Sequence, residues 1–141
     1  MNNLVKHTTI LWADDDPDEL ELIHAVLQDM GTPYHIVEMR NGMEALTFLE
    51  AAKERGTFPC LIVLDINMPV LNGKETLVRI KQDAVLTDIP VVLFTTSRSP
   101  IDKKFSESHG AEMLTKPITY DALKEIVNRL LHMCEVSVKA Q

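Results

Sequence analysis

Five short apolar runs alternate with five amphipathic segments along this chain of 141 residues. Most of the runs lack the alternation of a half-exposed strand, so we expect strands that are buried on both faces. The predicted strands are residues 8–13, 34–39, 61–64, 89–94 and 113–115. Repeated strand–helix alternation predicts a parallel sheet with right-handed crossovers and helices on both faces.

The composition narrows the class of partners. A chain of this length, with 45% hydrophobic residues, suits one globular domain. The net charge is −7 and the lysines and arginines form no block, which argues against a nucleic-acid partner. No apolar stretch is long enough to span a bilayer, and residues 1–4 lack the apolar core of a signal peptide. A cytoplasmic location without a membrane partner fits these features.

The cysteines and the C-terminal residues give weaker expectations. Cys60 and Cys134 lie far apart and predict no disulfide framework. Cys60 falls in an apolar run and is most simply a small buried hydrophobe. Residues 133–141 follow the last amphipathic segment and are expected to form a loose tail or a short added element. We therefore expect a single domain with its core at about residues 8–132.

Polar side chains follow four of the predicted strands, at the point where each strand ends. Asp14 and Asp15 follow the first strand and Asp65 follows the third. Thr95 follows the fourth, and Lys116 follows the fifth. Parallel strands end at one edge of the sheet, and open α/β sheets bind ligands there. Carboxylates, a hydroxyl and an ammonium at this edge predict a phosphoryl-transfer site with a divalent cation.

The acidic cluster has two interpretations when it is taken alone. Adjacent carboxylates such as Asp14 and Asp15 raise each other's pKa unless a cation neutralises them, and Mg²⁺ prefers such oxygen ligands. Acidic residues also favour helix N-termini, so the pair could equally cap a helix. Asp16, beside Pro17, fits the capping role better and is expected to be peripheral.

The other candidates also have ordinary interpretations. Asp65 could be a nucleophile that forms an acyl phosphate, or an aspartate that starts a turn. Asn67 could give its backbone carbonyl to a metal. A lone Thr95 is most often an ordinary strand residue. Pro117 holds Lys116 in extended geometry at the sheet edge, although a single Lys-Pro pair is common.

The order and spacing of the motifs are more specific than any one motif. The chain carries Asp14-Asp15-Asp16-Pro17, then Leu64-Asp65-Ile66-Asn67-Met68-Pro69 with Gly73, then Thr95-Thr96-Ser97, then Lys116-Pro117. On five strand–helix units this order resembles the receiver domain of two-component response regulators, over about residues 8–132. The segment 86–90 and the lack of an output domain are similar to stand-alone receivers paired with bacterial phytochrome-type kinases.

The resemblance implies a fold and a set of roles. The fold is α/β, a flavodoxin-like five-stranded parallel sheet in the order 2-1-3-4-5 with five helices. Asp65 is the implied phosphoacceptor for a histidine kinase, Thr95 the switch hydroxyl and Lys116 the ammonium that contacts the phosphoryl group. The implied Mg²⁺ ligands are Asp14, Asp15, Asp65 and Asn67. Such a chain is not a dedicated enzyme; it switches a surface for a downstream protein partner, and a homodimer is also open.

One position departs from the resemblance. Three residues before Lys116 the family commonly carries a Tyr or Phe that rotates on activation, and this chain has Met113. A methionine is flexible and fills gaps differently from an aromatic ring. We therefore expect the response to run mainly through Thr95 and backbone shifts.

Three other protein classes share parts of this pattern. A haloacid-dehalogenase-type enzyme would fit Asp14 and Asp16, but it needs an acidic pair after its lysine, where this chain has only the separated Asp121 and Glu125. A pseudo-receiver, which keeps the fold without phosphorylation, would not need the full set of site residues. A flavodoxin would want a hydroxyl-rich phosphate loop after the first strand, where three aspartates would repel a phosphate.

Overall fold

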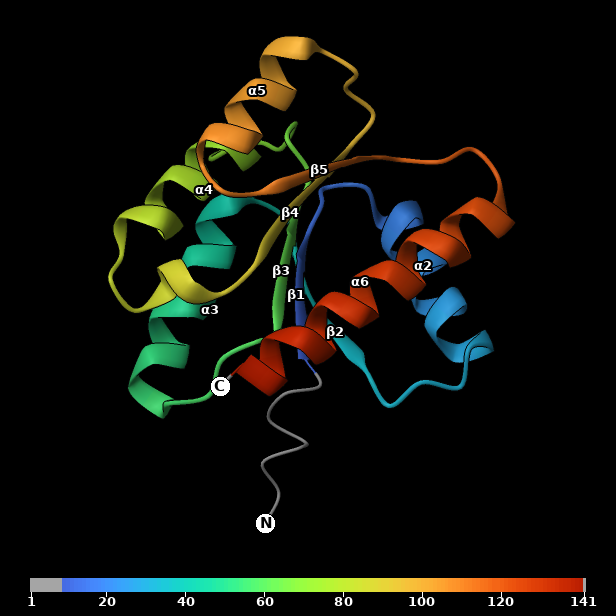
Figure 1. Ribbon diagram of the computed structural model, residues 1–141, viewed down its shortest axis with the longest axis horizontal. Helices are drawn as coiled ribbons and strands as arrows, with labels where there is room; N and C mark the ends of the chain where they lie inside the picture. Colours follow the sequence, from blue (N-terminus) through green and yellow to red (C-terminus); the bar gives the residue numbers. More distant parts are fainter. Residues whose placement is uncertain (1–8, 141) are drawn as a thin grey trace.

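The computed structural model describes residues 9–140 and contains one five-stranded parallel sheet (Figure 1). Its strands are β1 (Thr9–Ala13), β2 (His35–Met39), β3 (Leu61–Leu64), β4 (Val91–Thr95) and β5 (Glu112–Thr115). They are ordered β2-β1-β3-β4-β5, and every neighbouring pair is parallel. The predicted order 2-1-3-4-5 is therefore confirmed. The strand boundaries agree to within two residues, and Thr8 lies outside the described residues.

In the described part of the chain, four α-helices and one 3₁₀ turn connect the strands, and a fifth α-helix follows the last strand. They are α2 (Pro17–Asp29), α3 (Gly42–Arg55), α4 (Gly73–Gln82), the 3₁₀ turn η1 (Leu86–Asp88), α5 (Pro100–Ser108) and α6 (Tyr120–Ala140). Helices α2 and α6 cover one face of the sheet, while α3, α4 and α5 cover the other (Figure 1). This arrangement follows from parallel pairing, because each connection must cross over the sheet and can pack on either face.

Each face of the sheet has its own hydrophobic core. Under α2 and α6 the cluster includes Trp12 and Phe94, whose rings meet edge to face with centroids 5.6 Å apart. On the other face Leu11 and Leu64 pack against α3 and α4 residues such as Leu77. Every residue of β3 and β4 is buried, as expected for strands covered on both faces. The two cores therefore hold the ends of the central strands in fixed positions.

Local hydrogen bonds fix the starts of two helices near the carboxyl edge of the sheet. Asp16 caps α2, and its Oδ1 accepts a hydrogen bond of 3.0 Å from the Asp18 amide. At the start of α4, Asn72 and Glu75 bond each other's backbone amides in a capping box. The capping role expected for Asp16 is thereby confirmed.

Helix α6 is longer than the sequence analysis predicted. Residues 133–140 continue the helix, which spans 21 residues, so the expectation of a loose tail from residue 133 was wrong. The buried residues Leu130, Leu131 and Cys134 extend the helical spacing, and neither Gly nor Pro interrupts it. Among the described residues, no helix is both long and apolar enough to cross a membrane.

The expectation for the two cysteines was also wrong. Cys60 and Cys134 are joined in a disulfide across 74 positions of sequence. Cys60 is buried as predicted, with 1% of its surface exposed, but it is not an isolated apolar residue. The sequence spacing could not show this pairing, because it arises only when α6 packs diagonally across the sheet to the start of β3.

Candidate functional site

The predicted site residues gather at the carboxyl edge of the sheet. Asp14 and Asp65 directly follow β1 and β3, Thr95 ends β4, and Lys116 follows β5. The backbone ladder continues into the site: the Asp65 amide donates to the Ala13 carbonyl at 3.0 Å. The Lys116 amide likewise donates to the Thr95 carbonyl at 2.8 Å. These bonds fix the backbone from which each functional side chain projects.

Three carboxylates form a compact cluster. Asp14, Asp15 and Asp65 each contribute an oxygen, and these oxygens all lie within 4.8 Å of one another. Asp14 is 1% exposed and Asp65 is 9% exposed, whereas Asp15 is open to solvent. Two of the carboxylates are thus held in a protein environment while the third faces water.

Lys116 bridges the two buried carboxylates. Its Nζ donates to Asp14 Oδ2 at 2.8 Å and to Asp65 Oδ2 at 3.1 Å. The same Nζ lies 3.8 Å from Glu19 Oε1 in the first turn of α2. Glu19 was not predicted as a site residue from the sequence. Its position four residues after Asp15, at the start of a helix that follows the site, was the available signal.

Burial and charge shift the pKa values of these groups. Burial raises the pKa of the Asp14 carboxyl, and the hydrogen bond from Lys116 only partly offsets this. For Lys116, burial lowers the pKa, but the hydrogen bond with Asp14 and the charge of Asp65 outweigh it and the net shift is upward. Burial likewise raises the pKa of Glu19. Lys116 is therefore a permanent cation near neutral pH, and the surrounding carboxylates favour additional positive charge.

The donor set fits a small, hard divalent cation. Mg²⁺ and Mn²⁺ are bound through a few carboxylates, with the remaining positions left to water, carbonyl and phosphate oxygens. The three clustered carboxylates and the one ammonium leave two negative charges uncompensated, which a divalent ion would neutralise. Asn67 lies two residues beyond Asp65 in the same loop with an exposed side chain, and its role as a carbonyl ligand stays a prediction.

Thr95 belongs to a polar network that extends to two helices. Its buried Oγ1 accepts a hydrogen bond of 3.2 Å from the Ser97 amide. The Ser97 hydroxyl donates to Asp102 on α5, and Asp102 forms an ion pair with Lys74 on α4. These partners lower the pKa of Asp102, so it is ionised at neutral pH. Sequence reasoning singled out Thr95 but had no signal for its link to α4 and α5.

Comparison with known proteins bears directly on this geometry. Residues 10–128 match the family described as the response regulator receiver domain. The chain belongs to this family. Receiver domains accept a phosphoryl group on an aspartate, receive it from histidine kinases, and are in general not dedicated enzymes.

Two relatives of this receiver have a similar length. It is 31% identical over 123 residues to the protein PilH of Pseudomonas aeruginosa, covering 86% of this chain and 96% of PilH. It is 36% identical over 110 residues to the response regulator Rcp1 of Synechocystis, covering 76% of this chain and 75% of Rcp1. The receiver therefore resembles proteins that consist mostly of this one domain.

Two solved structures share the fold of this receiver. The phosphorylated cyanobacterial phytochrome response regulator RcpA matches with a TM-score of 0.79 and 32% identity, covering 88% of this chain and 91% of RcpA. The Mn²⁺-bound form of Rcp1 matches with a TM-score of 0.75 and 32% identity, covering 85% and 88%. Receiver domains bind a divalent metal, in agreement with the acidic cluster found here.

Proposed function

We propose that this receiver accepts a phosphoryl group from a histidine kinase on Asp65, in a reaction that requires Mg²⁺. One observation carries the proposal: Lys116 bridges Asp14 and Asp65 beside the cluster of three carboxylates. This arrangement supplies a nucleophile, a divalent-ion site and a fixed cation at a single sheet edge. Phosphoryl transfer depends mainly on such positioning and charge.

The chemical step follows from the environment of Asp65. Among the described residues its side chain takes a hydrogen bond from Lys116 on Oδ2, which leaves Oδ1 for attack. An Oδ1 lone pair forms a bond to the phosphorus of a phosphohistidine, while the P–N bond breaks and its electrons return to the imidazole. The product is an acyl phosphate on Asp65 and a free histidine on the kinase.

Neighbouring residues would stabilise the transferred charge. Asp14, Asp15, Asp65 and the carbonyl of Asn67 would hold the Mg²⁺. When bound, Mg²⁺ offsets negative charge on the phosphoryl oxygens. Lys116 is already within hydrogen-bonding distance of Asp65, so a small shift of its ammonium would bring it onto the new phosphoryl group. Only a small rearrangement of the protein is then needed during transfer.

Thr95 is the residue through which the signal would spread. A phosphoryl group adds about 1.5–2 negative charges and new acceptor oxygens. Thr95 could then turn its hydroxyl towards this group, at the cost of the contact with Ser97. Met113 is half-buried against the hydrophobic core on the α3 and α4 face of the sheet, and it carries no polar group that could turn towards the phosphoryl group. The affected surface is that of α5, β5 and α6, which we propose as the site for a downstream protein or a second copy.

The relatives suggest the kind of kinase. Rcp1 is named a response regulator and RcpA a phytochrome response regulator, and each resembles this chain over most of its length. We therefore infer a stand-alone receiver that serves a phytochrome-type histidine kinase. A cytoplasmic location is part of the proposal, because the donor histidine is phosphorylated from ATP.

The reaction can be tested without the kinase. Purified protein is incubated with acetyl phosphate, with either Mg²⁺ or EDTA, and weighed intact. We expect one added phosphoryl group with Mg²⁺ and almost none with EDTA. Release of the adduct by hydroxylamine would identify an acyl phosphate. Absence of any adduct at saturating Mg²⁺ and acetyl phosphate would contradict the proposal.

A further inference from the structure

Strand β3 lies between a disulfide cysteine at its amino end and the proposed phosphoacceptor at its carboxyl end. Asp65 directly follows its carboxyl end, and Cys60 directly precedes its amino end, where it is bonded to Cys134 of α6. At the rise of an extended strand, Cys60 and Asp65 are about 16 Å apart. The disulfide thus lies outside the phosphoryl site but on the same rigid strand.

We propose that Cys60 and Cys134 form a thiol–disulfide switch, which fastens the C-terminal part of α6 to the sheet when oxidised and releases it when reduced. The proposal does not rest on phosphorylation of Asp65. Its basis is the placement of the two cysteines: their Cα atoms lie 5.0 Å apart, within the range of natural disulfides. Both side chains belong to the core cluster under α2 and α6.

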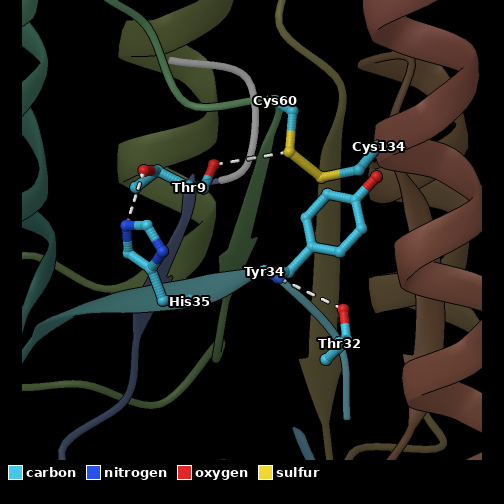
Figure 2. The surroundings of a disulfide bond; sticks show 6 residues. All are labelled: Thr9, Thr32, Tyr34, His35, Cys60 and Cys134. Atoms are coloured by element: carbon cyan, nitrogen blue, oxygen red, sulfur yellow. Dashed lines mark hydrogen bonds between the residues drawn. A yellow bond between two sulfur atoms is a disulfide. The ribbon is translucent and has the colours of Figure 1, made fainter. Parts of the chain in front are cut away.

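The surroundings can accommodate the reduced state as well. Cys60 Sγ lies 3.4 Å from the Thr9 carbonyl oxygen, so a Cys60 thiol would have an acceptor at once (Figure 2). Figure 2 also shows the ring of Tyr34 beside the bond on the side of Cys134. A free Cys134 thiol there would behave as a small hydrophobe among apolar neighbours. Opening the bond therefore buries one thiol with an acceptor and one weakly polar thiol among apolar side chains, and the core can persist.

The end of α6 depends on this bond more than the rest of the helix does. Cys134 is fully buried, whereas Glu135 and Val136 after it are exposed and Ser137 is half-buried. Cys134 is thus the last fully buried anchor among the α6 side chains that the structure describes. Helix ends with few buried contacts open most easily, so loss of the covalent anchor should let this end fray.

A route for exchange leads through the helix turn that carries Cys134. A cleft of about 600 Å³ opens between the segment before β2 and α6, and its walls include Tyr34, Leu131 and Glu135, although neither cysteine lines it. Since Cys134 itself is fully buried, exchange needs a brief opening of the helix end towards this cleft. Thiol reagents would then attack Cys134 before Cys60, because Cys60 sits at the start of the central strand β3.

The oxidant and the electron balance are those of thiol–disulfide exchange. The Cys134 thiolate attacks glutathione disulfide and releases one glutathione thiolate. The Cys60 thiolate then attacks the mixed disulfide and releases the second, so two protein thiols are oxidised and one glutathione disulfide is reduced. In a reducing cytoplasm, disulfides are rare and mostly transient or redox-sensing. That favours a switch over a permanent cross-link.

The bond and its effect are measured separately. Protein equilibrated with glutathione disulfide or with dithiothreitol is denatured, alkylated and weighed intact. We expect a monomer with no alkylated cysteine after oxidation and with both alkylated after reduction. Amide exchange in residues 130–137 should be at least about tenfold faster in the reduced protein, and its melting temperature about 10 °C lower.

Two variants provide the controls. In Cys134→Ala and in Cys60→Ala the remaining thiol has no partner in the chain, so dithiothreitol should change neither the melting temperature nor the exchange of α6. Two free thiols in the parent protein after treatment with glutathione disulfide would overturn the proposal, and so would a disulfide between two chains. Equal exchange of α6 in the oxidised and reduced parent would overturn the switch.

Discussion

Lys116 Nζ lies 2.8 Å from Asp14 Oδ2, although the two residues are 102 positions apart in the sequence. The same ammonium reaches Asp65 Oδ2 at 3.1 Å. One cation therefore links two buried carboxylates. It compensates only part of their negative charge, so Lys116 and a divalent ion are partly interchangeable as sources of positive charge.

Replacement of Lys116 should destabilise the metal-free protein. In Lys116→Gln the two buried carboxylates lose their cation, so we expect the free energy of unfolding to fall by about 2 kcal/mol. Saturating Mg²⁺ should restore most of it, because the ion neutralises the same carboxylates. Thermal melting with and without Mg²⁺ measures both effects, and Lys104→Gln, at an exposed position of α5, is the matched control. A fold that collapses even in saturating Mg²⁺ would contradict this account.

The stability of Lys116→Gln at alkaline pH tests whether the charge of Lys116 stabilises the fold. The pKa of Lys116 is raised above its ordinary value of 10.5, so its contribution to stability is complete below pH 10.5 and is lost as pH rises through the higher folded-state value. The tyrosines Tyr34 and Tyr120 also have raised pKa values, but they titrate in both proteins. We expect the stability difference between parent and Lys116→Gln to shrink above pH 10.5. Urea unfolding across this range would measure it.

Neutralising Asp15 should weaken Mg²⁺ binding more than neutralising Asp16. Asp15 belongs to the carboxylate cluster, whereas Asp16 caps α2, and asparagine keeps a capping oxygen. The two variants Asp15→Asn and Asp16→Asn change the net charge equally. Bound Mg²⁺ at a hundred times its dissociation constant stabilises the parent by about 2.7 kcal/mol. We expect Asp15→Asn to need at least about tenfold more Mg²⁺ for the same shift in melting temperature. If Asp16→Asn needs more Mg²⁺ than Asp15→Asn, the ligands are misassigned.

A side chain at Gly73 should displace the proposed phosphoacceptor. A Cβ there would lie 2.2 Å from the Asp65 carbonyl oxygen, which is backbone and cannot move aside independently. Gly73→Ala should therefore cost about 1–3 kcal/mol of stability and slow phosphorylation from acetyl phosphate. Gly110→Ala is the control, because it strains a residue at φ +70° with open space around it. Equal phosphorylation rates in both variants would show that α4 does not position Asp65.

Removal of the Thr95 hydroxyl should separate phosphorylation from its structural response. In Thr95→Ala the surroundings of Asp65 stay the same. The variant lacks the hydroxyl that would break its hydrogen bond with the Ser97 amide and turn to the phosphoryl group. We expect Thr95→Ala to gain the phosphoryl group while the change in amide exchange over residues 95–120 disappears. Thr95→Ser should restore it. An unchanged exchange pattern in the phosphorylated parent would mean that the chain does not signal through this face.

The sequence predicted the parts of the fold that depend on local pattern. The buried runs around Leu11 and Ile62 gave the central strands, and the polar residues at strand ends gave the site edge, because parallel strands all end on one side. The capping role of Asp16 was predicted from its place before Pro17. The order of the strands was predicted from the resemblance to a family, because the local sequence pattern does not distinguish between different orders of parallel strands in a sheet.

The features that were missed depend on contacts between distant segments. The Cys60–Cys134 pair needs the diagonal packing of α6, and the link from Ser97 through Asp102 to Lys74 needs α4 and α5 side by side. Part of the continuation of α6 to Ala140 could have been predicted, because Cys134 keeps the helical spacing of the buried residues before it.

Intact-mass analysis of Asp65→Asn is the most direct test of the phosphoacceptor. Asparagine keeps the size of the side chain but cannot form an acyl phosphate by attack of a carboxylate oxygen. Parent, Asp65→Asn and Asp16→Asn are incubated side by side with acetyl phosphate and Mg²⁺. We predict one phosphoryl group on the parent and on Asp16→Asn, and none on Asp65→Asn. Labelling of Asp65→Asn to the same extent as the parent would contradict the assignment of Asp65.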